Sequence, residues 1–251
     1  MLTIVMPMAG RGKRFQDEGY ALPKPLIPVH GKPMVEVVLD NLRPSQPHQF
    51  VFVLLEEHVR EHRIDAFVKE LEPSCKIVVV DGVTEGAACT VLLAREWIDT
   101  DAPLMVANCD QWIDIDINDY LAAMDREEAD GLIMTMWADH PKWSYVRFGE
   151  DGRIVEVVEK QVVSNEATVG IYNYRRGQDF VEAADRMIGK NLRVNNEFYV
   201  APAYNEMIAD GKKIIIHNVG REYAGMYGLG IPSDLKQFES LAVSRKAVHE
   251  G

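Results

Sequence analysis

The chain has 251 residues, 47% of them hydrophobic, which suits a globular core in one large domain or one domain with an added lobe. Its 39 acidic and 27 basic side chains give a net charge of −12, so a nucleic-acid-binding surface is not expected. The chain has no run of 18 apolar residues, no recognisable signal peptide and no CxxC pair among its three cysteines. These features predict a cytoplasmic protein without a membrane span, disulfide framework or zinc site.

Short apolar runs alternate with helical stretches in the first part of the chain. We expect strands at 2–7, 50–55, 76–81 and 103–107, and helices at 33–42, 57–71, 86–97 and 117–127. Strands separated by helices indicate a parallel sheet. Residues 1–130 are therefore interpreted as an α/β half.

The chain changes character after residue 130. Strand-like segments follow at 131–137, 143–149, 154–159 and 168–174, with Glu150-Asp151-Gly152-Arg153 as a hairpin turn. We then expect helices at 177–189 and 197–210, a strand at 213–219, and a closing helix that starts at Pro232. Residues 131–251 are interpreted as a smaller mixed half that covers the first, so that 1–251 form one domain.

The segment after the first predicted strand, Met8-Ala9-Gly10-Arg11-Gly12-Lys13-Arg14, combines two glycines with three cations. Its glycines allow backbone N–H groups to turn toward one point, and its cations surround that point, an arrangement that holds phosphate. Lys24 lies between two prolines, so its backbone is stiff and it loses little entropy on meeting a ligand. From residue 11 to 32, five basic and two acidic residues give a local charge of +3.

This basic segment favours one anionic ligand over a solvated loop, because a solvated loop would leave the glycines and prolines unexplained. Two other phosphate-binding motifs fit less well. A dinucleotide fingerprint would need a third glycine where Phe15 stands, and a P-loop would need a Gly-Lys-Ser/Thr sequence that the chain lacks.

Three polar segments follow directly after predicted strands: the loop 8–14, the turn 82–88 and Asp110. Ligands of open α/β sheets bind beyond the carboxyl ends of the strands, so we expect these segments to form one site. Asp110 is predicted to hold Mg²⁺ beside phosphate, although a turn-forming aspartate remains the alternative. A rival metal motif, Asp114-Ile115-Asp116, stands just before a predicted helix, and we favour a helix-capping role for it.

Further polar segments are candidates for contacts with substrates. Thr84-Glu85-Gly86-Ala87-Ala88 offers a small, glycine-containing surface for a flat base, whose amino group Glu85 would meet, and Thr84 as a helix cap is a compatible alternative. Glu159-Lys160 ends a strand, and its lysine either reaches a second phosphate or forms an exposed salt pair. Asn195-Asn196-Glu197-Phe198-Tyr199 opens a predicted helix and either contacts an acceptor or caps that helix.

Together these motifs resemble those of the nucleotidyltransferases that activate sugar phosphates, which carry Gly-x-Gly-x-Arg and Pro-Lys-Pro after their first strand. Asn108-Cys109-Asp110 resembles their Asn-Gly-Asp metal site, and the turn at 84–88 and the Glu-Lys pair at 159–160 are similar to theirs. Val169-Gly170-Ile171-Tyr172 resembles their Ala-Gly-Ile-Tyr strand. Residues 228–235 resemble their closing Asp-x-Gly-Thr-Pro-x-Asp-Leu. The motifs occur in the same order along almost the whole chain, and they look most similar to those of the short, capsule-type members.

The resemblance implies a Rossmann-like, mostly parallel mixed sheet flanked by helices, of the GT-A-like type, with a nucleotide-binding half and an acceptor-binding half. It implies Mg²⁺-dependent coupling of a nucleoside triphosphate to a phosphorylated sugar or other small phospho-acceptor with release of pyrophosphate, for capsule or surface polysaccharide synthesis. No nucleic acid or membrane is expected as a partner, and a homo-oligomer is left open.

The resemblance also implies roles for individual residues. The catalytic set is Arg14, Lys24 and Asp110, with Asp110 also the metal ligand. The nucleotide would contact Met8, Ala9, Gly10, Arg11, Gly12, Lys13, Thr84, Glu85, Gly86, Ala87 and Asn108. The acceptor would contact Glu159, Lys160, Gly170, Asn196 and Glu197.

One departure from the family pattern concerns the metal. Gly228 stands where many relatives carry a second metal-binding aspartate, and Ile231 replaces the motif threonine. Either another acid completes the metal shell, or Asp110 suffices beside phosphate oxygens and water. Two alternatives therefore stay open: a GT-A glycosyltransferase that uses a nucleotide sugar, and a non-catalytic nucleotide sensor.

Overall fold

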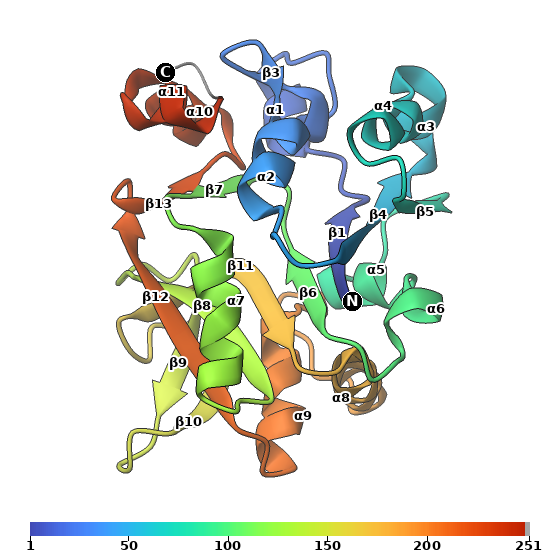
Figure 1. Ribbon diagram of the computed structural model, residues 1–251. Helices are drawn as coiled ribbons and strands as arrows, with labels where there is room; N and C mark the ends of the chain where they lie inside the picture. The colour runs from blue at the N-terminus through green and yellow to red at the C-terminus, as the bar shows by residue number, and fades with distance from the viewer. Residues whose placement is uncertain (249–251) are drawn as a thin grey trace.

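A mixed sheet of eleven strands runs through the protein in the computed structural model, which describes residues 1–248 (Figure 1). Its strands are β1 Leu2–Met8, β4 His48–Leu55, β5 Lys76–Val80, β6 Leu104–Ala107, β7 Gln111–Ile113, β8 Gly131–Trp137, β9 Ser144–Phe148, β10 Ile154–Glu159, β11 Glu166–Tyr174, β12 Ile214–Glu222 and β13 Gly225–Gly228. A separate two-stranded sheet joins β2 Pro28–Val29 to β3 Lys32–Pro33.

Helices connect most of these strands. They are α1 Lys13–Asp17, α2 Met34–Leu42, α3 Glu56–His62, α4 Ile64–Leu71, α5 Ala87–Leu92, α6 Arg95–Ile98, α7 Ile117–Arg126, α8 Gly177–Gly189, α9 Tyr204–Ala209, α10 Pro232–Ser240 and α11 Val243–Ala247, with 3₁₀ turns η1 Lys24–Leu26 and η2 Ala201–Ala203. Within residues 1–248, no helix has the length and apolar character needed to cross a membrane.

Four strands of the first half, β1, β4, β5 and β6, pair in parallel. The strand β1 lies between β4 and β6, and β5 extends the sheet beyond β4. The strand β11, from the second half, runs antiparallel to both β6 and β8 and so joins the two halves in one sheet. Beyond β8 the order is β12, β13 and β7. The predicted fold class, a Rossmann-like, mostly parallel mixed sheet flanked by helices, is confirmed.

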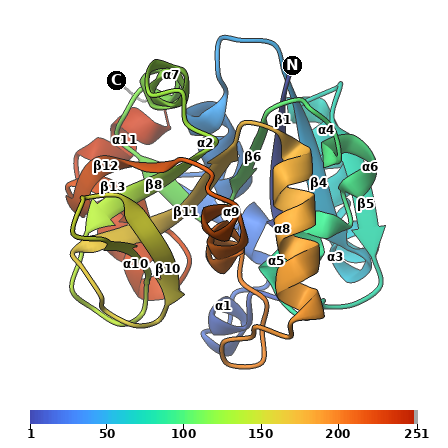
Figure 2. The ribbon, with the colours of Figure 1, turned by 90° about the horizontal axis from the view of Figure 1, so that it is seen from below.

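Helices cover both faces of the sheet because side chains alternate along each buried strand. In β1, Ile4 and Met6 pack in a core shared with α2, α4, α7 and α10, whereas Val5 packs in a second core with α5, α6, α8 and α9. Figure 2 shows α8 beside α9 and α5 on the second face. The C-terminal α10 and α11 lie at the same end of the molecule as α1 (Figure 1), where Lys236 pairs with Glu18 at 3.3 Å.

Three predicted helices differ from the structure. The helix expected at 57–71 is interrupted at Arg63, whose backbone is left-handed, and the one at 86–97 divides into α5 and α6. The helix expected from 197 begins only at η2, because Phe198 instead exchanges backbone hydrogen bonds with the 85–88 turn. Asn196, just before it, has a positive φ. The expected hairpin turn at 150–153 is confirmed between β9 and β10, but the short strands β7 and β13 were not predicted.

Candidate active site

The basic loop and Lys24 lie against each other at the end of β1. Gly12 has φ +64°, in the left-handed region that glycine favours, and directly precedes α1. A Cβ on Gly12 would lie 3.1 Å from the Cβ of Lys24, so the loop packs tightly on η1. The side chain of Phe15 is buried and anchors the short helix, while Arg14 remains exposed. The basic loop and Lys24 are therefore in contact, close to the end of β1.

Lys24 also contacts the predicted metal ligand. Its Nζ donates a hydrogen bond to Asp110 Oδ2 at 2.8 Å, and both side chains are mostly buried. Burial alone would lower the pKa of Lys24, but the charge of Asp110 and its hydrogen bond with Lys24 act against burial, and that pKa is raised. Cys109 itself is buried, which raises its pKa to about 11 and keeps the thiol protonated. The pair thus joins a stable cation to a carboxylate at the carboxyl edge of the sheet.

A second carboxylate approaches the same edge through the segment Gly228–Gly230. Leu229 is fully buried, so its two glycine neighbours face the other way. A Cβ on Gly230 would lie 2.6 Å from Asp110 Oδ2, and a Cβ on Gly228 would lie 3.3 Å from Asp234 Oδ2. The absence of side chains at these two positions therefore leaves room for Asp110 and Asp234. Sequence analysis did not single out Asp234 as a site residue.

Asp234 lies among several charged and polar groups. Tyr223 donates a hydrogen bond from its hydroxyl to Asp234 Oδ1 at 3.3 Å. Burial raises the pKa of Asp234, while the charges of Lys142 and Arg14 act in the opposite direction. Arg14 thus lies close enough to influence both Asp234 and Lys24. Two carboxylates, from Asp110 and Asp234, thus lie near the same edge of the sheet as three cations. The cations are those of Arg14, Lys24 and Lys142.

The predicted base-binding turn is held by contacts with Phe198. Gly86 has φ +137°, and a Cβ there would lie 2.4 Å from the backbone N and O of Phe198. Thr84 Oγ1 lies 2.6 Å from Thr90 Oγ1 and donates to the Gly86 carbonyl. Gly86, not Thr84, occupies the N-cap position of α5, so the capping interpretation of Thr84 is wrong. Glu85 is exposed and forms an ion pair with Arg193.

A cavity of about 180 Å³ opens beside this turn. Its lining includes four predicted site residues, Ala87, Asn108, Glu159 and Gly170, together with Tyr172 and Tyr199, which belong to two segments quoted in the sequence analysis. It adds residues that the sequence analysis did not identify: Gln111, Lys142, Trp143, Ser144, Thr168, Val200 and Ala201. No motif in the sequence marked these added residues, because they come from separated strands and loops.

Side chains within this cavity are oriented by close contacts. Gly170 has φ +84°, and a Cβ there would lie 2.3 Å from Asn108 Nδ2, so only glycine fits beside the amides of Asn108 and Gln111. Ser144 donates a hydrogen bond to the buried Glu159, whose pKa is raised by burial. Gln111 is 8% exposed, and its Oε1 has no hydrogen-bond partner among the described residues.

The remaining predicted acceptor residues lie at the margin of the cavity. Lys160 has φ +56°, and its Nζ donates to the hydroxyl of Tyr199 at 2.6 Å. Glu197 also hydrogen-bonds Tyr199, which lines the cavity, whereas Asn196 lies in the preceding loop. Neither Asn196 nor Glu197 lines the cavity itself.

The rival metal motif has structural roles. Asp116 is the N-cap of α7 and accepts a hydrogen bond from the backbone N–H of Asn118 at 2.8 Å. Asp114 forms an ion pair with Lys246. The predicted capping role is thus confirmed for Asp116. Within residues 1–248, no cluster of three or more His, Cys, Asp or Glu side chains is arranged to hold a metal ion.

Comparisons with known proteins point to one family. The sequence model described as "Nucleotidyl transferase" matches residues 3–198. The bifunctional protein GlmU of Methanococcus maripaludis is 25% identical over 176 residues, which cover 68% of this chain and 39% of that protein. The GlmU of Paraburkholderia xenovorans is 24% identical over 249 residues, which cover 96% of this chain and 52% of that protein. The chain therefore spans about half the length, or less, of these curated relatives.

Two solved structures share the fold. A nucleoside-diphosphate-sugar pyrophosphorylase from Vibrio cholerae superposes with a TM-score of 0.77 at 24% identity, covering 95% of this chain and all of the other. A putative glucose-1-phosphate thymidylyltransferase from Bacillus anthracis, solved with sucrose, has a TM-score of 0.74 at 19% identity and covers 96% of this chain and 95% of its own.

Proposed function

This chain belongs to the nucleotidyl transferase family, and we propose that it joins a nucleoside monophosphate unit, taken from a nucleoside triphosphate, to a phosphorylated sugar. The observation that carries this proposal is the contact between Lys24 and Asp110, which places a cation and a carboxylate between the basic loop and the cavity beside Asn108. A nucleoside triphosphate and an acceptor phosphate can therefore meet at one edge of the sheet.

In the proposed reaction, an acceptor phosphate oxygen attacks the α-phosphorus of the nucleotide in line. A new P–O bond forms as the bond to the β-phosphate oxygen breaks, and pyrophosphate leaves with that electron pair. The protein supplies alignment and charge neutralisation, without a covalent intermediate. Arg14 and the loop 8–13 would hold the departing β- and γ-phosphates. Lys24 would neutralise charge at the α-phosphate, and Lys160 at the acceptor phosphate.

The residues at this edge fit Mg²⁺. Asp110 and Asp234 offer hard oxygen donors beside the same glycine-containing segment, and Mg²⁺ is commonly held through one or two carboxylates while substrate phosphates and water complete its shell. Bound there, the metal would neutralise charge on the phosphates. The carboxylate of Asp110 would then contact both Lys24 and the metal. Asp234 would supply the second carboxylate that many relatives carry at the position of Gly228.

The cavity beside Gly170 is proposed as the sugar subsite. It is lined mainly by uncharged hydrogen-bonding groups and aromatic rings, with Lys142 as its basic residue and Glu159 as its acidic one. Hydroxyl groups of a sugar can donate to and accept from such groups. The unpartnered Gln111 Oε1 supports this assignment, because buried polar atoms in native proteins generally have partners.

The cellular role is a further part of the proposal. We propose cytoplasmic synthesis of a nucleotide-activated sugar for capsule or surface polysaccharide, with residues 1–130 as the nucleotide-binding half and 131–251 as the acceptor-binding half. The three free cysteines, Cys75, Cys89 and Cys109, support a reducing compartment. Whether the protein forms a homo-oligomer can be measured by light scattering.

The proposed activity can be tested by following pyrophosphate release. Each of four nucleoside triphosphates is incubated with glucose 1-phosphate, N-acetylglucosamine 1-phosphate and other phosphorylated acceptors in the presence of Mg²⁺. At least one combination should release pyrophosphate in step with a nucleotide sugar. Transfer of sugar from a nucleotide sugar without pyrophosphate release would instead identify a glycosyltransferase. Nucleotide binding with no turnover across the panel would favour a sensor.

A further inference from the structure

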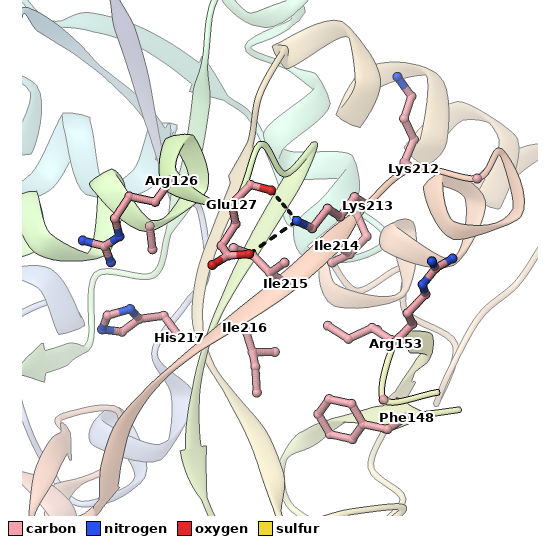
Figure 3. A pocket seen from close by; sticks show the side chains of 14 residues that line it. Arg126, Glu127, Phe148, Arg153, Lys212, Lys213, Ile214, Ile215, Ile216 and His217 are labelled. Atoms are coloured by element: carbon pink, nitrogen blue, oxygen red, sulfur yellow. Dashed lines mark hydrogen bonds and ion pairs between the residues drawn. The ribbon is translucent and has the colours of Figure 1, made fainter. Parts of the chain in front are cut away.

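A cavity of about 820 Å³ lies away from the candidate active site and surrounds the beginning of β12 (Figure 3). The strands β6 and β8 both run antiparallel to β11, and β12 runs parallel to β8. The start of β12 therefore lies at the edge of the sheet opposite to Asp110. The cavity and the proposed sugar subsite have no lining residue in common.

The first half of β12 is an open edge of the sheet. One side of the strand pairs with β8 from Ile214 to Asn218. On the other side of β12, β13 pairs only with Arg221 and Glu222. Within residues 1–248, no strand pairs with Ile214–Val219 on that side. Such an edge presents backbone N–H and C=O groups to an incoming strand.

Two walls turn this open edge into a slot. Ile215 and His217 face the core that includes α7, and the His217 ring lies edge-on to Tyr120, 5.6 Å away between ring centroids. Ile214 and Ile216 face the opposite core, on the side of the β9–β10 hairpin. Figure 3 shows Arg126 and Glu127 on one side of β12, and Phe148 and Arg153 on the other. A strand placed in the slot would send alternate side chains toward each wall.

The charged side chains that line the slot are mainly basic, which favours an acidic partner. Four basic side chains and one acidic side chain line it, in a protein whose net charge is −12. Three of the four basic residues have acidic neighbours. Lys213 pairs with Glu127, and Lys212 lies 3.7 Å from Asp130. Arg153 lies 3.5 Å from Asp151. Arg126 is exposed and has no ion-pair partner within residues 1–248. A symmetric pairing of two copies through this edge would bring like charges together, which disfavours a second copy of this chain.

We propose that the open edge of β12 is a docking site for an extended, acidic segment of a partner protein, which adds to the sheet as a further strand. Backbone hydrogen bonds to Ile214–Val219 would give affinity, and apolar side chains would pack against Ile216 and Phe148 on one wall. The alternate, acidic side chains would meet Arg126 on the other wall, and Arg153 would add to the positive charge of the slot. The open edge runs from Ile214 to Val219, so an added strand of about six residues would pair along its whole length.

The test uses a fluorescein-labelled peptide of three Glu-Val repeats, with three Lys-Val repeats as its matched control. The acidic peptide should bind the full-length protein, and the basic one should bind at least about tenfold more weakly. The double variant Arg126→Glu/Arg153→Glu should bind the acidic peptide about tenfold or more weakly than the parent protein. Both substituted side chains are exposed, so the fold should persist.

Two measurements separate strand addition from general electrostatic attraction. The variant Arg60→Glu/Lys69→Glu carries the same charge change on α3 and α4, and it should bind the acidic peptide nearly as well as the parent. Hydrogen–deuterium exchange should show that the acidic peptide protects those backbone amides of Ile214–Val219 that point away from β8. Absence of binding, equal binding by Arg126→Glu/Arg153→Glu, or binding that leaves these outward-pointing amides unprotected would overturn the proposal. A peptide-free dimer in which the same outward-pointing amides are already protected would assign the edge to a second copy instead.

Discussion

Lys24 Nζ lies 2.8 Å from Asp110 Oδ2, although 86 residues separate them in the chain. The contact links the loop after β1 with the residues that follow β6, and these strands are neighbours in the sheet. Because burial raises the cost of an isolated charge, the carboxylate of Asp110 stabilises the charged form of Lys24. A substrate or metal that engages Asp110 must therefore share it with Lys24.

Replacing Asp110 should abolish most of the activity. Asp110→Asn removes the carboxylate proposed to hold the metal and leaves Lys24 without its counter-charge. Loss of a group that stabilises developing charge typically costs about 10²–10³-fold in turnover. Pyrophosphate release measures the effect, with circular dichroism to confirm that the fold persists.

The matched control for Asp110 is the pair Asp114→Asn and Asp116→Asn. Asp116 caps α7, and asparagine caps helices about as well as aspartate, so Asp116→Asn should change stability little while most activity remains. An active Asp110→Asn enzyme together with inactive variants at 114 and 116 would contradict the proposed nucleotidyl transfer and favour a glycosyltransferase.

Arg14 and Lys24 should affect catalysis in different ways. Arg14 is exposed on the basic loop, where it is proposed to hold the departing pyrophosphate. Arg14→Ala should therefore lower turnover and also weaken inhibition by added pyrophosphate. Lys24→Ala should lower turnover with less effect on that inhibition, because Lys24 is assigned to the α-phosphate. Inhibition constants for pyrophosphate measure the difference, and an unchanged constant in Arg14→Ala would remove Arg14 from this role.

Gln111 should matter for the acceptor more than for the fold. Its buried Oε1 has no hydrogen-bond partner within residues 1–248, so Gln111→Leu should leave thermal stability unchanged or slightly increased. If a sugar hydroxyl donates to Gln111, the same variant should raise the KM for the sugar phosphate about tenfold or more, without changing the KM for the nucleotide. Gln111→Glu, which keeps an acceptor atom, is the matched control. Equal KM values for the acceptor in parent and Gln111→Leu would contradict this role.

The metal should bind weakly until the nucleotide is present. Free protein offers at most two carboxylates, which replace little of the hydration shell of Mg²⁺. A non-hydrolysable nucleoside triphosphate should strengthen Mn²⁺ binding, measured by electron paramagnetic resonance, and the metal should strengthen nucleotide binding by the same factor.

Asp234 provides the sharper test of the metal assignment. Asp234→Asn should weaken Mn²⁺ binding in the nucleotide complex, and Gly228→Asp/Asp234→Asn should recover part of it, because the two positions lie side by side. Manganese affinity that is unaffected by Asp234→Asn would show that Asp110 is the sole carboxylate needed.

Gly86 should be sensitive to substitution because of its contact with Phe198. A Cβ there would lie 2.4 Å from two backbone atoms of Phe198, and φ is +137°. Gly86→Ala should lower the free energy of unfolding by roughly 2–4 kcal/mol, as for other strained positions, and should disturb the turn proposed to hold the base. Gly82→Ala is the control, since no atom lies within 4 Å of its Cβ position. Urea denaturation measures both, and similar stability losses in the two variants would contradict the explanation.

The sequence by itself determined the local elements and their order. Apolar runs of strand length gave β1, β4, β5 and β6, and the glycines and prolines around them marked the loop at 8–14 and the residue Lys24. Since parallel strands bring their carboxyl ends to one edge, the convergence of this loop with Asp110 followed from chain order alone.

Only the tertiary structure decided which side chains share a site across separated segments. The contact of Gly86 with Phe198 replaced the helix expected from residue 197, because local helix preference is weaker than the packing and hydrogen bonds gained in the folded chain. Gln111 lies in no motif of the sequence, and Asp234 lies in the closing motif at 228–235 without a role assigned to it there. They join the site through the bulge at Gly170 and the turn at Gly228–Gly230. The open edge of β12 is likewise a property of strand order in the sheet, which the sequence of one strand does not record.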